Sequence, residues 1–234
     1  MKKIQLAMIS ASIIGMSATA VNAQSKFEGF YGQVGVGFSS VSPDLNATTL
    51  TPPPGNVPTS YPMGTSISST SSFAGAFGLG YTFSVSPKFT LGLGADYQPF
   101  GGQSGNYTLT NAALNPSSVT GTFKQEQTMN LYIAPGIATS PEGLLYGKIG
   151  YSASNFSYGN GGSQNLSGFL VGLGYKQIIQ GGFYGFAEAN YTSYGKANVG
   201  ATGRWNSGVV GTYAINGQLS ANTFSGLVGV GYKF

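Results

Sequence analysis

Few side chains in this 234-residue sequence are suited to chemistry. The sequence contains no histidine and no cysteine, which removes Ser-His-Asp and Cys-His catalysis and the usual ligands of zinc sites. Carboxylates alone can act as general acid and base, but no spacing here singles out a pair. The remaining candidates are six charged residues within strand-like segments: Asp96, Lys124, Glu126, Lys148, Lys176 and Glu188.

These six charges favour a structural role. Unpaired interior charges are costly, and three residues of each sign can neutralise one another. We therefore expect a buried network of ion pairs and hydrogen bonds, and we expect neither an enzyme nor a metal or cofactor site. The alternative for the same residues is a narrow polar pathway or gated pore.

The segments that carry these charges alternate apolar with small or polar residues. Such alternation places successive side chains on opposite faces of a β-strand. The pattern is clearest at the end of the sequence, where Val228, Val230, Tyr232 and Phe234 share one face. It predicts eight strands, near 28–39, 72–83, 88–99, 122–136, 143–154, 166–177, 182–194 and 221–234.

Composition indicates which solvent each face meets. Only 7% of the residues are charged, against about 25% in ordinary soluble domains. A soluble barrel needs a charged surface, whereas a barrel in lipid needs an apolar outer face and a small, polar inner one. The sequence therefore predicts an all-β fold, an eight-stranded antiparallel up-and-down transmembrane β-barrel. A soluble ligand-binding barrel, with its apolar face turned inward, is the alternative architecture.

The first 23 residues are typical of a cleaved signal peptide. Lys2 and Lys3 precede a mostly apolar stretch, and Val21-Asn22-Ala23 matches a small-residue cleavage site. We expect the barrel domain to span residues 24–234. Short turns should alternate with long extracellular loops at 40–71, 100–121, 155–165 and 195–220.

Face parity assigns large apolar residues to the lipid side and glycines, tyrosines and the six charges to the lumen. Aromatic residues fall at both ends of the lipid-facing sets, which predicts two interfacial girdles. The periplasmic girdle comprises Phe83, Phe89, Tyr175, Phe183 and Phe234. The outer girdle comprises Phe38, Phe73, Tyr97, Tyr151, Tyr191 and Phe224.

A weaker signal lies in the fourth long loop. Arg204 and Trp205 pair a cation with a stacking aromatic ring, a combination that can contact an anionic sugar or a lipopolysaccharide phosphate. A loop that packs on itself explains the same pair equally simply and is the favoured interpretation.

Together, the signal peptide, the eight alternating segments, the loop asymmetry and the terminal VGVGYKF resemble the small outer-membrane β-barrel, porin-like family. That family includes outer-membrane protein X, the transmembrane domain of outer-membrane protein A and opacity-type surface proteins. The resemblance implies a bacterial outer-membrane location. It also implies that Val228, Val230, Tyr232 and Phe234 form the signal presented to the barrel-assembly machinery.

These features lead to a functional hypothesis. We expect a structural or surface-interaction role through the loops, namely envelope integrity, adhesion or host contact. The alternative is a narrow porin or conduit for small or apolar solutes. Expected partners are outer-membrane lipid, lipopolysaccharide, the assembly machinery and an extracellular ligand of the loops. Without Lys2 and Lys3, 8 basic residues stand against 6 acidic ones, and this net charge of +2 is too small to indicate nucleic acid as a partner.

Overall fold

The computed structural model describes residues 25–56, 59–99, 104–114, 117–159, 162–203 and 212–234. The expected signal peptide at 1–23 lies outside these ranges. The part of the chain that the structure describes contains no helix long and apolar enough to span a membrane. Its strands are β1 (Gly29–Thr51), β2 (Tyr61–Pro62), β3 (Gly64–Ile67), β4 (Thr70–Ser84), β5 (Phe89–Gln98), β6 (Gly105–Thr110), β7 (Ser118–Ala138), β8 (Gly143–Tyr158), β9 (Gly162–Gln180), β10 (Phe183–Gly203) and β11 (Tyr213–Lys233).

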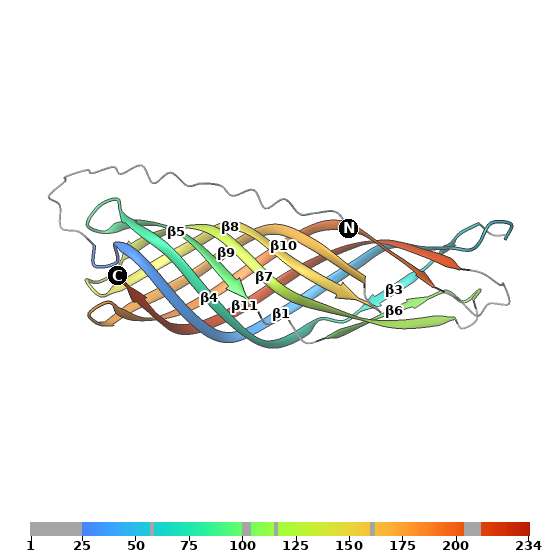
Figure 1. The fold of residues 1–234 in the computed structure, drawn as a ribbon, viewed down its shortest axis with the longest axis horizontal. Coiled ribbons are helices and arrows are strands. Elements are labelled where there is room, and N and C mark those ends of the chain that lie inside the picture. The colour runs from blue at the N-terminus through green and yellow to red at the C-terminus, as the bar shows by residue number, and fades with distance from the viewer. Residues whose placement is uncertain (1–24, 57–58, 100–103, 115–116, 160–161, 204–211) are drawn as a thin grey trace.

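Eight of these strands close into one antiparallel ring, in the order β1–β4–β5–β7–β8–β9–β10–β11 and back to β1 (Figure 1). Each strand of the ring pairs with its neighbours in sequence, which is the up-and-down topology. The first and last strands are joined over nearly their whole length, from Tyr31↔Lys233 to Thr51↔Ala214. Closure leaves no free edge in the ring, so backbone groups are satisfied without water. The predicted fold class is confirmed.

The outward face of the ring matches the expected lipid side. Large apolar side chains stand exposed on every strand, and residues of both predicted girdles are among them. Leu79 and Leu131, for example, are 67% and 68% exposed, a state that water would penalise and hydrocarbon would not. We call the region between the two girdles the barrel segment.

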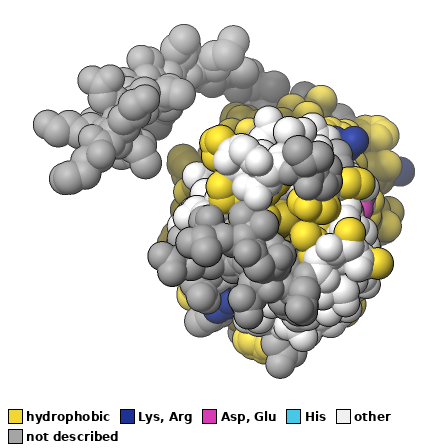
Figure 2. Space-filling model, turned by 90° about the vertical axis from the view of Figure 1, so that its right-hand side faces the viewer, with side chains coloured by type: hydrophobic (Ala, Val, Ile, Leu, Met, Phe, Trp, Pro, Cys, Tyr) yellow, Lys and Arg dark blue, Asp and Glu magenta, His cyan; other side chains and the backbone are white. Residues whose placement is uncertain are grey.

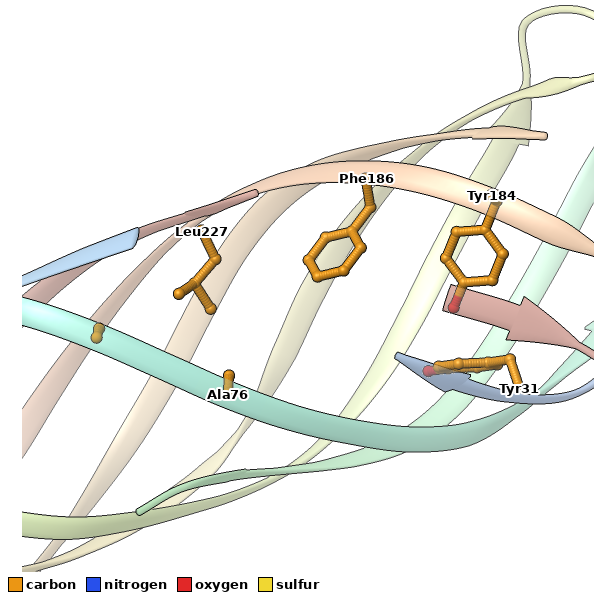
Figure 3. Packing of buried hydrophobic residues seen from close by; sticks show 6 residues of the cluster. Tyr31, Ala76, Tyr184, Phe186 and Leu227 are labelled. Atoms are coloured by element: carbon orange, nitrogen blue, oxygen red, sulfur yellow. The ribbon is translucent and has the colours of Figure 1, made fainter. Parts of the chain in front are cut away.

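Aromatic side chains that lie against glycine residues fill the lumen of the barrel segment. Tyr31, Tyr184, Phe186 and Leu227 point inward from three strands and pack together (Figure 3). A Cβ on Gly35 would lie only 2.9 Å from the Phe186 ring, so a larger residue there would displace the ring. Narrow eight-stranded barrels are normally filled by side chains, and here glycine makes the space for them.

The strands continue well past the outer girdle, and this corrects the predicted loops. About 9–11 residues suffice to cross a bilayer, yet β1 has 23 residues and β7, β10 and β11 have 21 each. Much of the sequence expected as loop at 40–71, 100–121, 155–165 and 195–220 is therefore strand. The residues there alternate as well, but the outward ones are mostly Ser, Thr and Asn. Because these residue types are common in loops, the sequence of these strands resembles that of loops.

We call this outer region the extension. It consists of residues 41–51, 118–126, 155–158, 162–167, 194–203 and 213–222 of the long strands, together with β2, β3 and β6. Where β4 and β5 stop, β3 and β6 continue the wall, because β6 pairs with β7 and β3 pairs with β6. β3 is tied to β1 by the Thr65 hydroxyl, which donates to the Leu45 carbonyl at 2.7 Å.

In the extension the wall is polar outside and apolar inside. Outward positions such as Asn198, Gln218 and Asn222 are exposed. Inward residues form two buried apolar clusters, one around Val41, Phe156, Leu166, Tyr194, Leu219 and Ala221, the other around Leu50, Met63, Leu109, Leu114 and Tyr213. Figure 2 looks onto this end of the molecule and shows apolar side chains (yellow) next to backbone and other side chains (white).

Three irregularities in register separate the two regions or lie within the extension. They occur in β1 between Asn46 and Thr49, in β7 between Gln125 and Thr128, and in β10 between Tyr194 and Ala197. A β-bulge adds a residue to one strand and so exchanges its inward and outward positions beyond that point.

Candidate functional site

An ion-pair network stands in the middle of the lumen. The ammonium group of Lys148, on β8, lies 2.5 Å from Asp96 Oδ2 on β5 and 2.7 Å from Glu188 Oε1 on β10. None of these three strands pairs with another of the three, so the salt bridges reach across the lumen. The three side chains are almost fully buried, Lys148 being 1% exposed.

Neighbouring polar groups satisfy the remaining carboxylate oxygens. The Tyr132 hydroxyl donates to Asp96 Oδ1 at 3.1 Å, and the Tyr146 hydroxyl donates to Glu188 Oε2 at 2.8 Å. Asn190 adds a further donor to Glu188 Oε1 at 2.6 Å. A buried ion pair is retained at low cost only when such hydrogen bonds complete it, and here all four carboxylate oxygens have a donor.

Lys176, on β9, is held differently. Its ammonium group lies 3.7 Å from the centre of the Tyr31 ring, with the Tyr184 and Tyr146 rings at 4.9 and 5.3 Å. No carboxylate of the described residues lies within salt-bridge distance of it. Three ring faces form an aromatic cage, which stabilises a cation that is partly removed from water.

Little space remains around these groups. Two cavities of about 10 Å³ each lie beside Tyr31 and Lys176, and both are lined by Thr82 and Leu144 as well. A cavity of this size holds about one water molecule. The lumen at this level is therefore a packed plug.

A second polar layer lies at the base of the extension, between its apolar clusters and the ion network, and sequence reasoning missed it. Gln125 Nε2 donates to Thr128 and Ser154 at 3.0 Å and to the Tyr194 hydroxyl at 3.3 Å. Thr223 donates in turn to Gln125 Oε1 at 3.3 Å. Tyr132 faces the lumen, so an unbroken alternation along β7 would place Gln125 on the outer face. The sequence does not reveal the bulge that turns Gln125 into the lumen.

The same bulge corrects the expectation for Lys124 and Glu126. Both were expected in the lumen, but both side chains are exposed on the outward face of the extension. The extra residue between Gln125 and Thr128 exchanges the faces, so Phe123 and Gln125 turn inward instead. The structure thus brings together Asp96, Lys148 and Glu188, places Lys176 in the lumen beside them, and leaves Lys124 and Glu126 in water.

The remaining sequence candidates lie elsewhere. Val228, Val230, Tyr232 and Phe234 all stand outward. The Phe234 amide donates to the Phe30 carbonyl at 2.9 Å, and its ring packs edge-on against Tyr232. Arg204 and Trp205 lie outside the described residues. Within those residues, no cluster of three potential metal ligands occurs.

The ion pairs and hydrogen bonds of the network restrict the movement of its side chains. Its carboxylates are paired with Lys148, all four carboxylate oxygens accept a hydrogen bond, and the cavities beside it are small. Such an arrangement stabilises a closed lumen and fixes the strands around it.

Solved structures of bacterial outer-membrane proteins resemble this chain. OprG of Pseudomonas aeruginosa superposes with a TM-score of 0.55 at 13% identity, covering 91% of this chain and 98% of that one. Neisserial surface protein A gives 0.46 at 17% identity over 88% and 97%. Ail, the attachment invasion locus protein of Yersinia pestis, gives 0.40 at 12% over 88% and 99%. At such identities the likeness to OprG supports the fold alone, and the two lower scores add no further argument.

A comparison with curated proteins finds no significant match. A family model does match, and its description is outer membrane protein beta-barrel domain. The match extends over residues 8–234 and includes the whole ring and the extension. The closed ring, the apolar outer face and this match together place the protein in the bacterial outer membrane. The chain belongs to the outer membrane protein β-barrel domain family.

Proposed function

We propose that this protein is a sealed outer-membrane barrel that acts at the cell surface through its extension. The role is structural or one of surface interaction: envelope integrity, adhesion or host contact. The observation that carries the proposal is the Lys148 side chain, which is 1% exposed between Asp96 and Glu188 in the centre of the lumen.

The packed lumen argues against the alternative of a conduit. A solute would have to separate two short salt bridges and displace the rings of Tyr31, Tyr132 and Tyr146 that line the lumen around them. Breaking a buried pair by removing one partner typically costs about 3–5 kcal/mol, well above thermal energy. The lumen is therefore a poor path for steady flow.

The extension supports the surface role. Its strands project beyond the part of the barrel where β4 and β5 end (Figure 1). Its polar side chains, such as Asn198 and Gln218, are exposed. Hydrogen-bonded strands hold this surface in a defined shape, which lowers the entropy cost of binding a partner compared with a mobile loop. A rigid platform that stands above the membrane suits recognition.

We further propose that the protein is not an enzyme. The chain has no histidine, and the two lumenal carboxylates Asp96 and Glu188 are each engaged by Lys148 and a tyrosine. A general acid or base needs access to a substrate, and neither carboxylate has it. Outer-membrane lipid, lipopolysaccharide and the barrel-assembly machinery remain its proposed partners, with an extracellular ligand bound by the extension.

Conductance in planar lipid bilayers tests the sealed lumen. Purified wild-type protein should give no stable openings. A variant that replaces Asp96, Lys148 and Glu188 by alanine removes the ion network and should open more often than the wild type, provided that it retains a heat-modifiable folded band. Stable, uniform openings from the wild type would contradict the proposal and favour the conduit.

The surface role is tested in cells. Residues 52–69 and 104–117 are replaced by Gly/Ser linkers, which removes β2, β3 and β6 and leaves the eight-stranded ring. Cells with this variant should lose adherence or resistance to detergent although the barrel still assembles. An assembled variant that changes neither property would refute a role for this part of the extension.

A further inference from the structure

A cavity of about 70 Å³ lies inside the extension. Its wall combines strands that are far apart in the sequence, from β1 to β11. Most of the lining is apolar and includes Leu45, Ile67, Leu109, Phe156, Ile215 and Leu219. Nothing of the charged network lines it, because the Gln125 layer lies between the two.

Thr48 is the unusual member of this lining. Its side chain is buried, at 4% exposed, and its Oγ1 has no hydrogen-bond partner among the described residues. The register shift between Asn46 and Thr49 accounts for its inward position. A buried hydroxyl without a partner is unfavourable and rare in folded proteins. The described residues therefore supply no hydrogen-bond partner for the Thr48 hydroxyl.

Water is a poor candidate for that group. A buried water molecule needs about 2–4 polar partners, and most of this wall is hydrocarbon. Apolar cavities instead stay dry or take up apolar molecules. Tyr107, Ser157 and Tyr158 also belong to the lining, and burial raises the pKa of the Tyr107 phenol, so this group remains a neutral donor.

We propose that the extension binds a small, mainly apolar molecule that carries one hydroxyl or carbonyl group. The apolar part lies between Leu109, Phe156 and Ile215, and the polar group exchanges a hydrogen bond with Thr48 Oγ1. This site goes beyond the surface role proposed above and does not depend on it. The molecule is retained above the sealed lumen and is not conducted through it.

The size of the cavity narrows the ligand class. An engineered cavity of about 150 Å³ binds benzene, so a cavity of about 70 Å³ holds only part of a ligand of that size, and the rest must extend through its partly open side. An unbranched chain can insert the end that carries its polar group and leave the other end outside the cavity. Hexanol and hexane form a suitable pair of probes, because they differ only in the hydroxyl group.

The first experiment locates binding with the full-length barrel in lipid nanodiscs. Hexanol should produce saturable shifts in the methyl NMR signals of Ile215 and Leu109. Val199→Trp fills the cavity from its β10 side and should abolish these shifts. Asn198→Trp adds the same ring on the opposite face of the strand and should leave them unchanged. Hexanol partitions into the nanodisc lipid equally with either variant. A difference between their NMR shifts therefore reports binding in the cavity.

The second experiment tests the hydrogen bond and keeps the shape of the site. Thr48→Val replaces the hydroxyl by a methyl group and should fold normally, because no contact of the hydroxyl is lost. It should weaken hexanol binding by about fivefold, the value of one ordinary hydrogen bond, and leave hexane binding unchanged or stronger. Equal effects on both probes, or no saturable shifts in the wild type, would overturn the proposal. Conductance and adherence would be unaffected by either result.

Discussion

The barrel segment and the extension are made from the same strands but have opposite polarity. In the barrel segment, Leu and Phe point outward, and Lys148, Asp96 and Glu188 point inward. In the extension, Asn and Ser point outward, and side chains such as Phe156 and Leu166 are buried inside. The outer face of the same wall therefore contacts hydrocarbon below the outer girdle and water above it.

The difference shows that the polarity of each face of the wall depends on the solvent that the face contacts. A β-strand has two faces wherever it lies, and each face takes the side chains that its surroundings favour. Two of the register shifts fall near the boundary, in β7 and β10. They let a strand change the parity of its inward positions as it passes from one solvent to the other.

The largest expected effect comes from breaking the interior of the barrel segment. Lys148→Met leaves Asp96 and Glu188 buried without their cation, which should cost about 3–5 kcal/mol of unfolding free energy. Urea unfolding of the folded barrel in detergent micelles measures the loss. A triple variant with Asp96→Asn and Glu188→Gln added should recover most of it, whereas an equally unstable triple variant would show that Lys148 acts through packing alone.

The outer faces differ in their tolerance of charge. Ile133→Arg places a cation on the lipid face of β7 near the middle of the barrel segment and should destabilise the barrel by about 2–4 kcal/mol. Thr122→Arg places the same group outward on the extension of the same strand and should have little effect. Folding yields into lipid vesicles, read from heat-modifiable mobility, compare the two. Similar yields would mean that the boundary lies elsewhere.

The interior of the extension should respond like a soluble core. Leu166→Ala removes most of a side chain that is 2% exposed and should lower the unfolding free energy by about 2 kcal/mol. This value is at the low end for buried leucines, because the wall of the extension borders water and can move to fill the space. Hydrogen exchange should rise in the extension and stay slow in the barrel segment. The outward neighbour provides the control, since Ser167→Ala should change neither. Faster exchange throughout the ring would argue that the two regions unfold as one.

The smallest effect concerns the periplasmic end. Lys26 and Glu142 form a salt bridge at 2.6 Å, but both side chains are substantially exposed. Exposed pairs contribute about 0–1 kcal/mol, so Lys26→Ala should shift the urea midpoint only slightly. A loss as large as that of Lys148→Met would contradict the contrast between exposed and buried pairs.

Much of the barrel segment could be predicted from the sequence. Alternation over ten or more residues specifies a strand, and low charge specifies lipid, so the facing of residues such as Leu93 and Phe77 follows directly. The ring order follows as well, because up-and-down topology pairs each strand with the next. Lys148, Asp96 and Glu188 could be placed in the lumen by parity, but their mutual contacts depend on the register between strands, which the sequence does not state.

The extension could not be predicted in the same way. Its strands alternate serine, threonine and asparagine with apolar residues, which resembles loop composition. Bulges then exchange the faces, and this is why Lys124 and Glu126 were expected inside although Gln125 is the residue that faces the lumen. No local residue pattern marks the shift in β7, where residues 125–128 contain no glycine or proline. The position of Thr48 depends on a similar shift in β1.

The reversal of polarity along one strand can be measured directly, because the chain has no native cysteine. Single cysteines are introduced in β10 at Ala189, Asn198 and Val199 and tested on intact cells with a water-soluble maleimide and with a bilayer-soluble one. We predict that Asn198→Cys reacts quickly with the water-soluble reagent, Ala189→Cys reacts only with the bilayer-soluble reagent, and Val199→Cys reacts slowly with both. Fast reaction of Ala189→Cys or Val199→Cys with the water-soluble reagent would contradict the reversal.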